Sequence, residues 1–211
     1  MSIGIVGLGE VGIAVAQDLT RTGHAVRCLD SRPDSRTRAS ARDLEIDMDK
    51  TPAAFLRQVG TVLITVQGRN AEAVALQLVP QMSPAAAYVD FTAKTVAARD
   101  AIFARCGDAR VLFADVAIMD TVSWPDRPTS LLVSGPASGR VEELFAGTRF
   151  RPRVLDAQKP VSTEIKLMRS VFTKGLTALL IETLVAAEKC GVRKEIQRTV
   201  TAFMREDFDR I

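Results

Sequence analysis

The chain has 211 residues, with 28 basic and 25 acidic side chains and a formal net charge of +3. That balance excludes a protein that binds nucleic acid through charge alone. Hydrophobic residues make up 47% of the chain and charged residues 25%, so it can build a core and is not disordered. The length allows one large domain, or one domain with a short appendage.

The sequence also bears on compartment and metal binding. Its first residues lack a basic segment and carry glycines, so no signal peptide is expected. No uninterrupted apolar run reaches the roughly 18–20 residues that cross a bilayer, so we expect no membrane partner. The three cysteines are odd in number and far apart, which favours a reduced, cytoplasmic setting. His24 is the one histidine, so no metal site is predicted.

Apolar runs alternate with helical patterns along residues 1–160. The apolar runs predict strands at 2–6, 25–29, 61–66, 87–91, 111–116 and 130–133. Helical patterns lie between them at 10–21, 71–79, 95–105 and 137–146. This alternation is typical of βαβ units, so we expect an α/β, doubly wound and mostly parallel sheet with helices on both faces.

The pattern changes after Pro160. Residues 163–190 contain no proline and are followed by Gly191, a plausible helix C-cap. They predict one helix, roughly 42 Å long. A shorter helix is predicted over 193–208. We therefore expect a nucleotide-binding domain at 1–160 and, at 161–211, a long helix with a short helical tail.

A glycine-rich turn follows the first predicted strand. It reads Gly7-Leu8-Gly9-Glu10-Val11-Gly12 and matches G-x-G-x-x-G between a strand and a helix. Gly7 would allow the tight turn, Gly9 the approach of a pyrophosphate, and Gly12 the close packing of helix on strand. The helix N-terminus would then face the anion. The motif predicts a Rossmann-type dinucleotide-binding domain.

The end of the second strand bears on the choice of cofactor. Asp30 could accept hydrogen bonds from the adenosine ribose hydroxyls, which favours NAD. Ser31 and Arg32 follow it and would suit the 2′-phosphate of NADP. The residues favour NAD, and NADP stays open.

Lys166 lies near the start of the long predicted helix. A helical wheel places five polar residues on its side of the helix: Arg169, Ser170, Thr173, Lys174 and Thr177. A lysine can give a proton to a carbonyl oxygen or an imine nitrogen, provided that burial or nearby cations lower its pKa. An ordinary exposed lysine fits the pattern equally well.

Four segments carry a resemblance to a known family. They are GIVGLGEVG near the start, DFT at 90–92, DVAIMDTV at 115–122, and the helix at 165–192 with its RSVFTKG run. With them the chain resembles the β-hydroxyacid dehydrogenase superfamily, which includes phosphogluconate dehydrogenase, 3-hydroxyisobutyrate dehydrogenase and imine reductases. The last two segments look closest to a phosphogluconate-dehydrogenase-like branch.

The resemblance implies roles for several residues. Lys166 would be the catalytic lysine, with Ser170 in place of the family's asparagine and Lys174 as a further substrate-binding candidate. Val66, Gln67 and Thr92 would border the nicotinamide. The family's substrate loop usually reads Ser-Gly-Gly, whereas this chain has Met119-Asp120-Thr121. Asp120 disfavours an anionic substrate unless it is paired or protonated.

The resemblance also implies a partner. Relatives carry a full helical domain after the long helix, whereas only residues 192–211 follow Gly191 here. One long helix cannot bury its own apolar face, so we expect a homodimer through 165–190 and the C-terminal helix. A helix packed on its own nucleotide-binding domain and an inactive fragment are the alternatives.

Three functions are weighed. The first is an NAD(P)-dependent oxidoreductase acting on a small hydroxyacid or carbonyl substrate, with Lys166 as general acid/base and imine reduction as a variant. The second is a dinucleotide-binding scaffold without activity. The third, nucleic-acid binding by the arginine-rich stretch 32–42, is disfavoured because that stretch lacks aromatic residues and occupies the place of the cofactor's adenosine loop.

Overall fold

The computed structural model describes residues 2–31 and 33–204. The chain divides into two compact units, Met1–Lys166 and Leu167–Ile211, whereas the sequence predicted two parts that meet at residue 160. The first unit holds a sheet with its helices, and the second holds most of the long helix and the helix that follows it.

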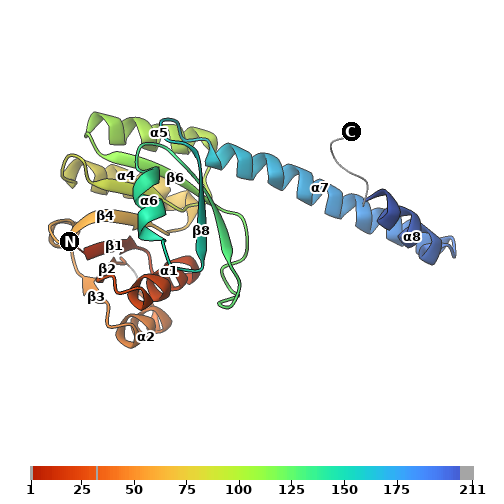
Figure 1. Cartoon of the computed structure of the whole chain (residues 1–211), viewed down its shortest axis with the longest axis horizontal. Coiled ribbons are helices and arrows are strands. Elements are labelled where there is room, and N and C mark those ends of the chain that lie inside the picture. The colour runs from red at the N-terminus through yellow and green to blue at the C-terminus, as the bar shows by residue number, and fades with distance from the viewer. Residues whose placement is uncertain (1, 32, 205–211) are drawn as a thin grey trace. The chain divides into compact units, whose positions relative to one another are not determined.

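The first unit is built on one eight-stranded sheet in the order β3-β2-β1-β4-β5-β6-β7-β8 (Figure 1). Neighbouring strands are parallel except for β6 and β7, which are antiparallel. The strands are β1 (Ser2–Val6), β2 (Val26–Leu29), β3 (Asp47–Asp49), β4 (Val59–Ile64), β5 (Ala87–Asp90), β6 (Leu112–Ile118), β7 (Thr129–Ser134) and β8 (Phe150–Asp156). This is the predicted doubly wound, mostly parallel sheet.

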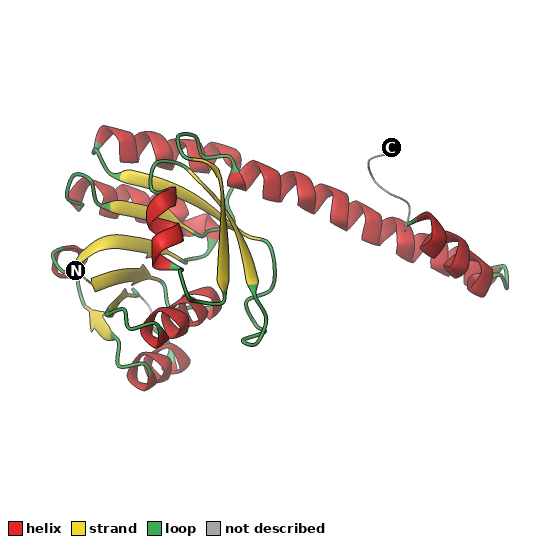
Figure 2. Ribbon diagram, in the orientation of Figure 1, coloured by secondary structure: helices red, strands yellow, loops and turns green. Residues whose placement is uncertain are grey.

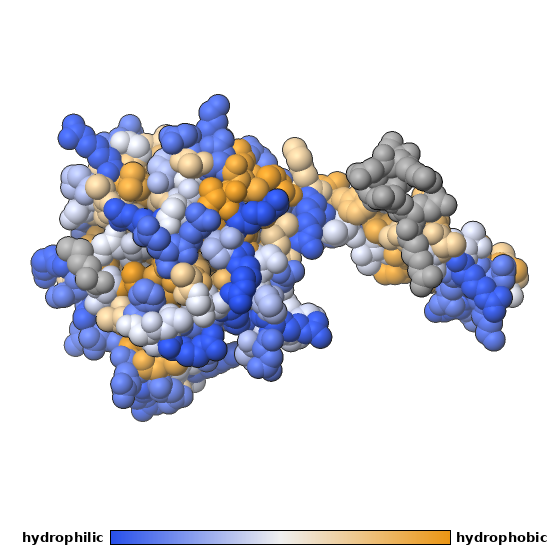
Figure 3. All heavy atoms as spheres, viewed as in Figure 1, coloured by the Kyte–Doolittle hydropathy of each residue, from blue (hydrophilic) through white to orange (hydrophobic). Residues whose placement is uncertain are grey.

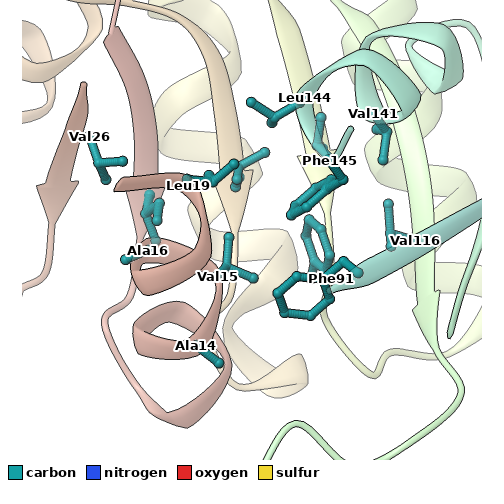
Figure 4. Packing of buried hydrophobic residues seen from close by; sticks show 14 of the residues in the cluster. Ala14, Val15, Ala16, Leu19, Val26, Phe91, Val116, Val141, Leu144 and Phe145 are labelled. Atoms are coloured by element: carbon teal, nitrogen blue, oxygen red, sulfur yellow. The ribbon is translucent and has the colours of Figure 1, made fainter. Parts of the chain in front are cut away.

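Helices cover both faces of the sheet (Figure 2). They are α1 (Glu10–Arg21), α2 (Ser35–Asp43), α3 (Pro52–Leu56), α4 (Ala71–Leu78), α5 (Val96–Asp108) and α6 (Ser138–Leu144), with short 3-10 turns η1 (Gly68–Asn70) and η2 (Val79–Gln81). One core packs α1, α2 and α6 against the sheet. Figure 4 shows the side chains that α1 and α6 contribute to it. The other core packs α3, α4 and α5 against the opposite face. The central strands are apolar because both their faces are buried.

Four elements were not predicted from the sequence: α2, β3, α3 and β8. The β8 strand contains Pro152 and alternates charged with apolar residues, a composition tolerated at the edge of a sheet. In α2 only Thr37 and Ala41 are buried, so the helix carries no apolar stripe that a sequence pattern could detect. The strands β3 and β8 are the two edges of the sheet. The helix α3 has only five residues, too few for a periodic pattern, although its Phe55 is fully buried in the core.

The long helix α7 (Ser162–Lys189) and α8 (Arg193–Phe203) confirm the predicted helical tail. Gly191 has a φ of +71° and ends the first of these helices, as its C-cap position predicted. Residues 205–208 of the predicted second helix lie outside the described residues. By length and composition alone α7 is apolar enough to cross a membrane, although charged residues interrupt its apolar runs. Core helices of soluble proteins that meet the same test are mostly buried, whereas 6% of the most apolar part of α7 is buried in the single chain.

Candidate functional site

The glycine turn between β1 and α1 leaves no room for a side chain at two of its positions, Gly7 and Gly12. Gly7 has a φ of +89°, which glycine adopts at no steric cost, and a Cβ there would lie 2.8 Å from Val66 Cγ1. A Cβ on Gly12 would lie 2.2 Å from the Gly7 carbonyl oxygen and 2.9 Å from Thr65 Oγ1. Thr65 Oγ1 donates a hydrogen bond to that carbonyl at 2.5 Å. The tight turn and the close approach of α1 to the end of β4 therefore require glycine at both positions.

Gly9 faces open space instead. A Cβ there would meet no atom within 4 Å in the part of the chain that the structure describes. Gly9 is also the N-cap of α1, which begins without a side-chain cap. The N–H groups of the first turn are therefore available to an anion, and the partial positive charge of the helix end attracts one. This is a cradle that any larger side chain at Gly9 would fill.

A cavity of about 600 Å³ lies at the carboxyl ends of β1, β2 and β4. These strands are neighbours in the order β2-β1-β4. The loop after β1 leads to α1 on one face of the sheet, and the loop after β4 leads to α4 on the other face, so a crevice opens between the two loops. The cavity is lined by Val6, Gly7, Gly9, Leu29, Asp30, Ser31, Thr65, Val66, Gln67, Arg69, Asn70, Ala73, Val74, Gln77 and Leu78. Its volume is in the range of cofactor sites. Six of these residues were predicted from the sequence.

Asp30 directly follows β2 and contacts the glycine turn between β1 and α1. Its Oδ2 accepts a hydrogen bond from the backbone N–H of Leu8 at 3.0 Å, so the acid is fixed against the glycine turn. The side chain of Leu8 is fully buried in the core, and Val11 packs against the same core, so these two motif residues support the turn from beneath. Ser31 is exposed at the cavity. Arg32 lies outside the described residues.

The sequence predicted only part of the side of the cavity that the segment after β4 forms. Arg69 and Asn70, from η1, line the cavity beside the predicted Val66 and Gln67. A Cβ on Gly68 would lie 1.8 Å from the carbonyl oxygen of Ala93, so the loops after β4 and β5 touch there. The order of the strands, which no single motif encodes, is the signal that would have found this side of the cavity.

The loop between β6 and β7 contacts the start of α1. Ser123 Oγ donates a short hydrogen bond to the carboxylate of Glu10, and Thr121 Oγ1 lies 3.3 Å from Ser123 Oγ. Asp120 Oδ2 accepts a hydrogen bond from the backbone N–H of Ser130 at 2.8 Å. The backbone N–H of Met119 donates to the carbonyl oxygen of the same serine. The predicted substrate loop is therefore tied to the glycine turn, and the Asp120 carboxylate is oriented by a hydrogen bond from the backbone.

Thr92 follows β5 and has a buried hydroxyl. The residue is 5% exposed, and its Oγ1 makes no hydrogen bond within the described residues. Its backbone N–H donates to Asp90 Oδ1 at 2.8 Å. Buried hydroxyls almost always have partners, so an unpartnered one at the carboxyl edge of the sheet fits a site that a ligand completes.

Lys166 lies in the second turn of α7 and is half-buried. The first turn of that helix is bound by the sheet and by α5. Both guanidinium NH groups of Arg99 lie 2.9 Å from the carboxylate of Glu164, and this ion pair lowers the pKa of Glu164. Ser170 and Lys174 come later along α7, in the second unit.

These features together define a dinucleotide-binding α/β protein. The open space at Gly9, the uncapped end of α1, the fixed Asp30 and the buried Thr92 hydroxyl fit a nicotinamide dinucleotide lying across the carboxyl ends of the strands. Residues 2–145 match the family model for the NAD-binding domain of 6-phosphogluconate dehydrogenase, so the chain belongs to that family. No curated protein sequence matches the chain.

Solved structures share the fold. A conserved hypothetical protein from Sinorhizobium meliloti is 26% identical, with 99% of this chain and 72% of that one covered and a TM-score of 0.81. The 3-hydroxyisobutyrate dehydrogenase of Mycobacterium tuberculosis, solved with L-serine, is 17% identical over 90% of this chain and 66% of that one, with a TM-score of 0.81. An imine reductase from Aspergillus terreus, solved with NADPH4, is 16% identical over 97% of this chain and 72% of that one, with a TM-score of 0.81. These structures confirm the predicted fold. The family model over residues 2–145 confirms the predicted relation to phosphogluconate dehydrogenase.

Proposed function

We propose that the protein is an NAD(P)-dependent oxidoreductase acting on a small hydroxyacid or carbonyl substrate, with Lys166 as the general acid/base. The observation that carries this proposal is the cavity at the carboxyl ends of β1, β2 and β4, in a chain that belongs to a family of NAD-binding domains. A nicotinamide dinucleotide bound there supplies or accepts the hydride. The residues of the chain bind it, orient the substrate and move the proton.

Each predicted residue has a task in this proposal. Backbone N–H groups at Gly9 and the start of α1 bind the pyrophosphate, and Asp30 accepts from the adenosine ribose. Val66, Gln67 and Thr92 border the nicotinamide. Lys166 gives a proton to the substrate oxygen during reduction and accepts it during oxidation. The residues that orient the substrate are Met119, Asp120, Thr121, Ser170 and Lys174.

The proposed cofactor is NAD, with NADP as the alternative. A carboxylate at Asp30 accepts hydrogen bonds from two ribose hydroxyls and repels a 2′-phosphate. Measuring the affinities of NADH and NADPH by their fluorescence tests this preference. Asp30→Ala should weaken NADH and leave NADPH unchanged or tighter. An unchanged affinity for NADH would remove Asp30 from the argument.

Imine reduction is the second candidate. The proton donor serves an imine nitrogen as well as a carbonyl oxygen. The hydrogen bond that Asp120 accepts from the backbone N–H of Ser130 is with a neutral donor, and a carboxylate in the substrate loop disfavours an anionic hydroxyacid more than a neutral imine. A panel of 3-hydroxyacids, ketoacids and cyclic imines, assayed with both cofactors, separates the two. Turnover that Lys166→Ala abolishes, while cofactor binding is retained, supports the enzyme. Tight cofactor binding without turnover of any compound supports a scaffold instead.

We further propose that the protein is a cytoplasmic homodimer that pairs through residues 165–190. Six large apolar side chains on this part of α7 are more than half exposed in the single chain: Met168, Val171, Phe172, Leu179, Ile181 and Val185. Figure 3 shows hydrophobic residues on the surface of the helix. Contiguous exposed apolar surface on a soluble protein marks an interface. Sedimentation at micromolar concentration should give the mass of two chains, and a monomer would refute the proposal.

A further inference from the structure

A cluster of three charged residues is buried at the carboxyl edge of the sheet. Asp90 and Asp115 are register partners on the parallel strands β5 and β6, and both are fully buried. The Nζ of Lys94 lies 3.3 Å from Asp90 Oδ2 and 3.0 Å from Asp115 Oδ1. Two adjacent buried carboxylates would repel each other, so the ammonium group between them compensates their charge.

One side of the cluster contacts the segment that borders the proposed nicotinamide position. Asp90 Oδ1 accepts the backbone N–H of Thr92, and Lys94 Nζ donates to the Thr92 carbonyl oxygen at 3.5 Å. Both contacts fix the backbone of Thr92 while leaving its buried hydroxyl unpartnered within the described residues.

The other side of the cluster contacts the start of α7. Asp115 Oδ2 accepts the backbone N–H of Thr163 at 2.7 Å, and Asp115 Oδ1 accepts the Thr163 hydroxyl at 2.7 Å. Next to it, Ser162 Oγ lies 2.8 Å from Ser134 Oγ. Because residues three and four apart share a helix face, Lys166 lies on the same face as Thr163 and Ser162. The residues that bind Thr163 therefore fix the part of α7 from which the Lys166 side chain extends.

These contacts join the two halves of the proposed site. Resting on the function proposed above, we propose that Lys94, Asp115 and Thr163 are positioning residues that hold Lys166 at a fixed place relative to Thr92 and hence to the nicotinamide. Apolar residues would fill the same space without the cost of desolvating three charges. Directional hydrogen bonds to Thr92 and to Thr163 are what an apolar cluster would not supply.

The test measures where Lys166 lies when cofactor is bound. Acetic anhydride at trace concentration labels lysine amines, and mass spectrometry gives the rate for Lys166 as a function of pH, with and without saturating NADH or NADPH. In the wild-type protein the bound dinucleotide should protect Lys166. Thr163→Val removes the hydroxyl that Asp115 accepts and should lose most of this protection. Thr163→Ser, which keeps the hydroxyl, should restore it.

Two controls separate positioning from stability. Glu164→Gln breaks the ion pair with Arg99 in the same helical turn, on the other side of α7, and should retain full protection. Circular dichroism and cofactor affinity verify that each variant is folded and binds. Should the valine variant not fold, Thr163→Ala removes the same hydroxyl.

The outcomes are distinct. If Lys166 is not protected in the wild-type protein, the proposed function fails at its catalytic lysine and the positioning inference falls with it. If the wild type is protected and Thr163→Val is protected equally, only the positioning inference is overturned. Loss of protection in Thr163→Val with recovery in Thr163→Ser supports it.

Discussion

At the residue scale, the buried aspartates on β5 and β6 have unequal roles. Burial raises the pKa of Asp90, while Lys94 and Thr92 oppose that rise only in part. Asp115 accepts two hydrogen bonds from Thr163 and pairs closely with Lys94. Asp115→Asn leaves a buried ammonium without its closest partner and should cost about 3–5 kcal/mol of unfolding free energy. Asp90→Asn should cost less, because Lys94 keeps its closer partner Asp115 and an amide oxygen still accepts from Thr92. Urea unfolding at pH 7 compares them, and equal costs would contradict this ranking.

The raised pKa of Asp90 should also make the free energy of unfolding depend on pH. A carboxyl whose pKa is higher in the folded than in the unfolded state stabilises the fold below its unfolded pKa, and this contribution is lost as the pH rises. The stability of the wild type relative to Asp90→Asn should therefore fall as the pH rises from about 4, the usual pKa of an aspartate, toward neutrality. Urea unfolding of both proteins across that range measures the difference. A difference that grows with pH would mean that Lys94 dominates over burial.

Two of the three cysteine thiols, Cys28 and Cys106, are buried and thereby protected from reagents in solution. Burial is the main cause that raises the pKa of Cys28 and of Cys106 to about 12, whereas Cys190 is exposed. The thiolate is the reactive form, so the buried pair should not react with a thiol reagent at pH 8 in the native state. No more than one thiol per chain should titrate before denaturant is added, and three should titrate after it. A second fast thiol in the native protein would contradict the described packing.

At the element scale, two glycines of the turn have different roles: Gly9 is expected to serve cofactor binding, and Gly12 the packing of the fold. A Cβ at Gly9 meets open space, whereas a Cβ at Gly12 meets the carbonyl oxygen of Gly7. Gly9→Ala should therefore cost less than about 1 kcal/mol of stability, yet weaken cofactor binding about tenfold or more, which corresponds to about 1.4 kcal/mol. Gly12→Ala should cost about 1–3 kcal/mol of stability through overpacking. Thermal unfolding and NADH titration measure both, and unchanged NADH affinity in Gly9→Ala would refute the cradle.

Most elements that the sequence predicted leave a pattern through their burial. β1, α1 and β4 have continuous or periodic apolar residues, and the glycine turn has a fixed spacing. The helix α7 is largely exposed in the single chain, and it was predicted from its length without proline and from the glycine that follows it. The edge strand β8 and the helix α2 gain their order from neighbours, so their own residues carry little signal. The same is true of Arg69 at the cavity and of the Lys94 cluster, whose members meet only because β4, β5 and β6 are adjacent in the sheet. Motifs show local geometry, whereas strand order brings distant segments together.

At the scale of the whole molecule, the two proposed functions, cofactor binding and dimerisation, lie on different surfaces. The glycine turn, Asp30 and the cavity belong to the first unit, and the exposed apolar residues of α7 belong mainly to the second. A change on the helix surface should therefore alter association without altering the cofactor cradle. This independence makes the proposed dimer testable apart from cofactor binding.

Val171 and Leu76 offer a matched pair for that test. Val171 is 76% exposed on α7, and Leu76 is 59% exposed on α4 in the first unit. If α7 is the dimer interface, Val171→Glu buries a charge against an apolar partner and should shift the protein toward monomer, because an unpaired charge at an interface is costly. Leu76→Glu should leave the mass unchanged. Both variants should bind NADH as the wild type does. Sedimentation measures the mass of each variant, and NADH titration on the same samples measures cofactor binding. If Val171→Glu remains a dimer with the wild-type dimerisation constant, the interface lies elsewhere.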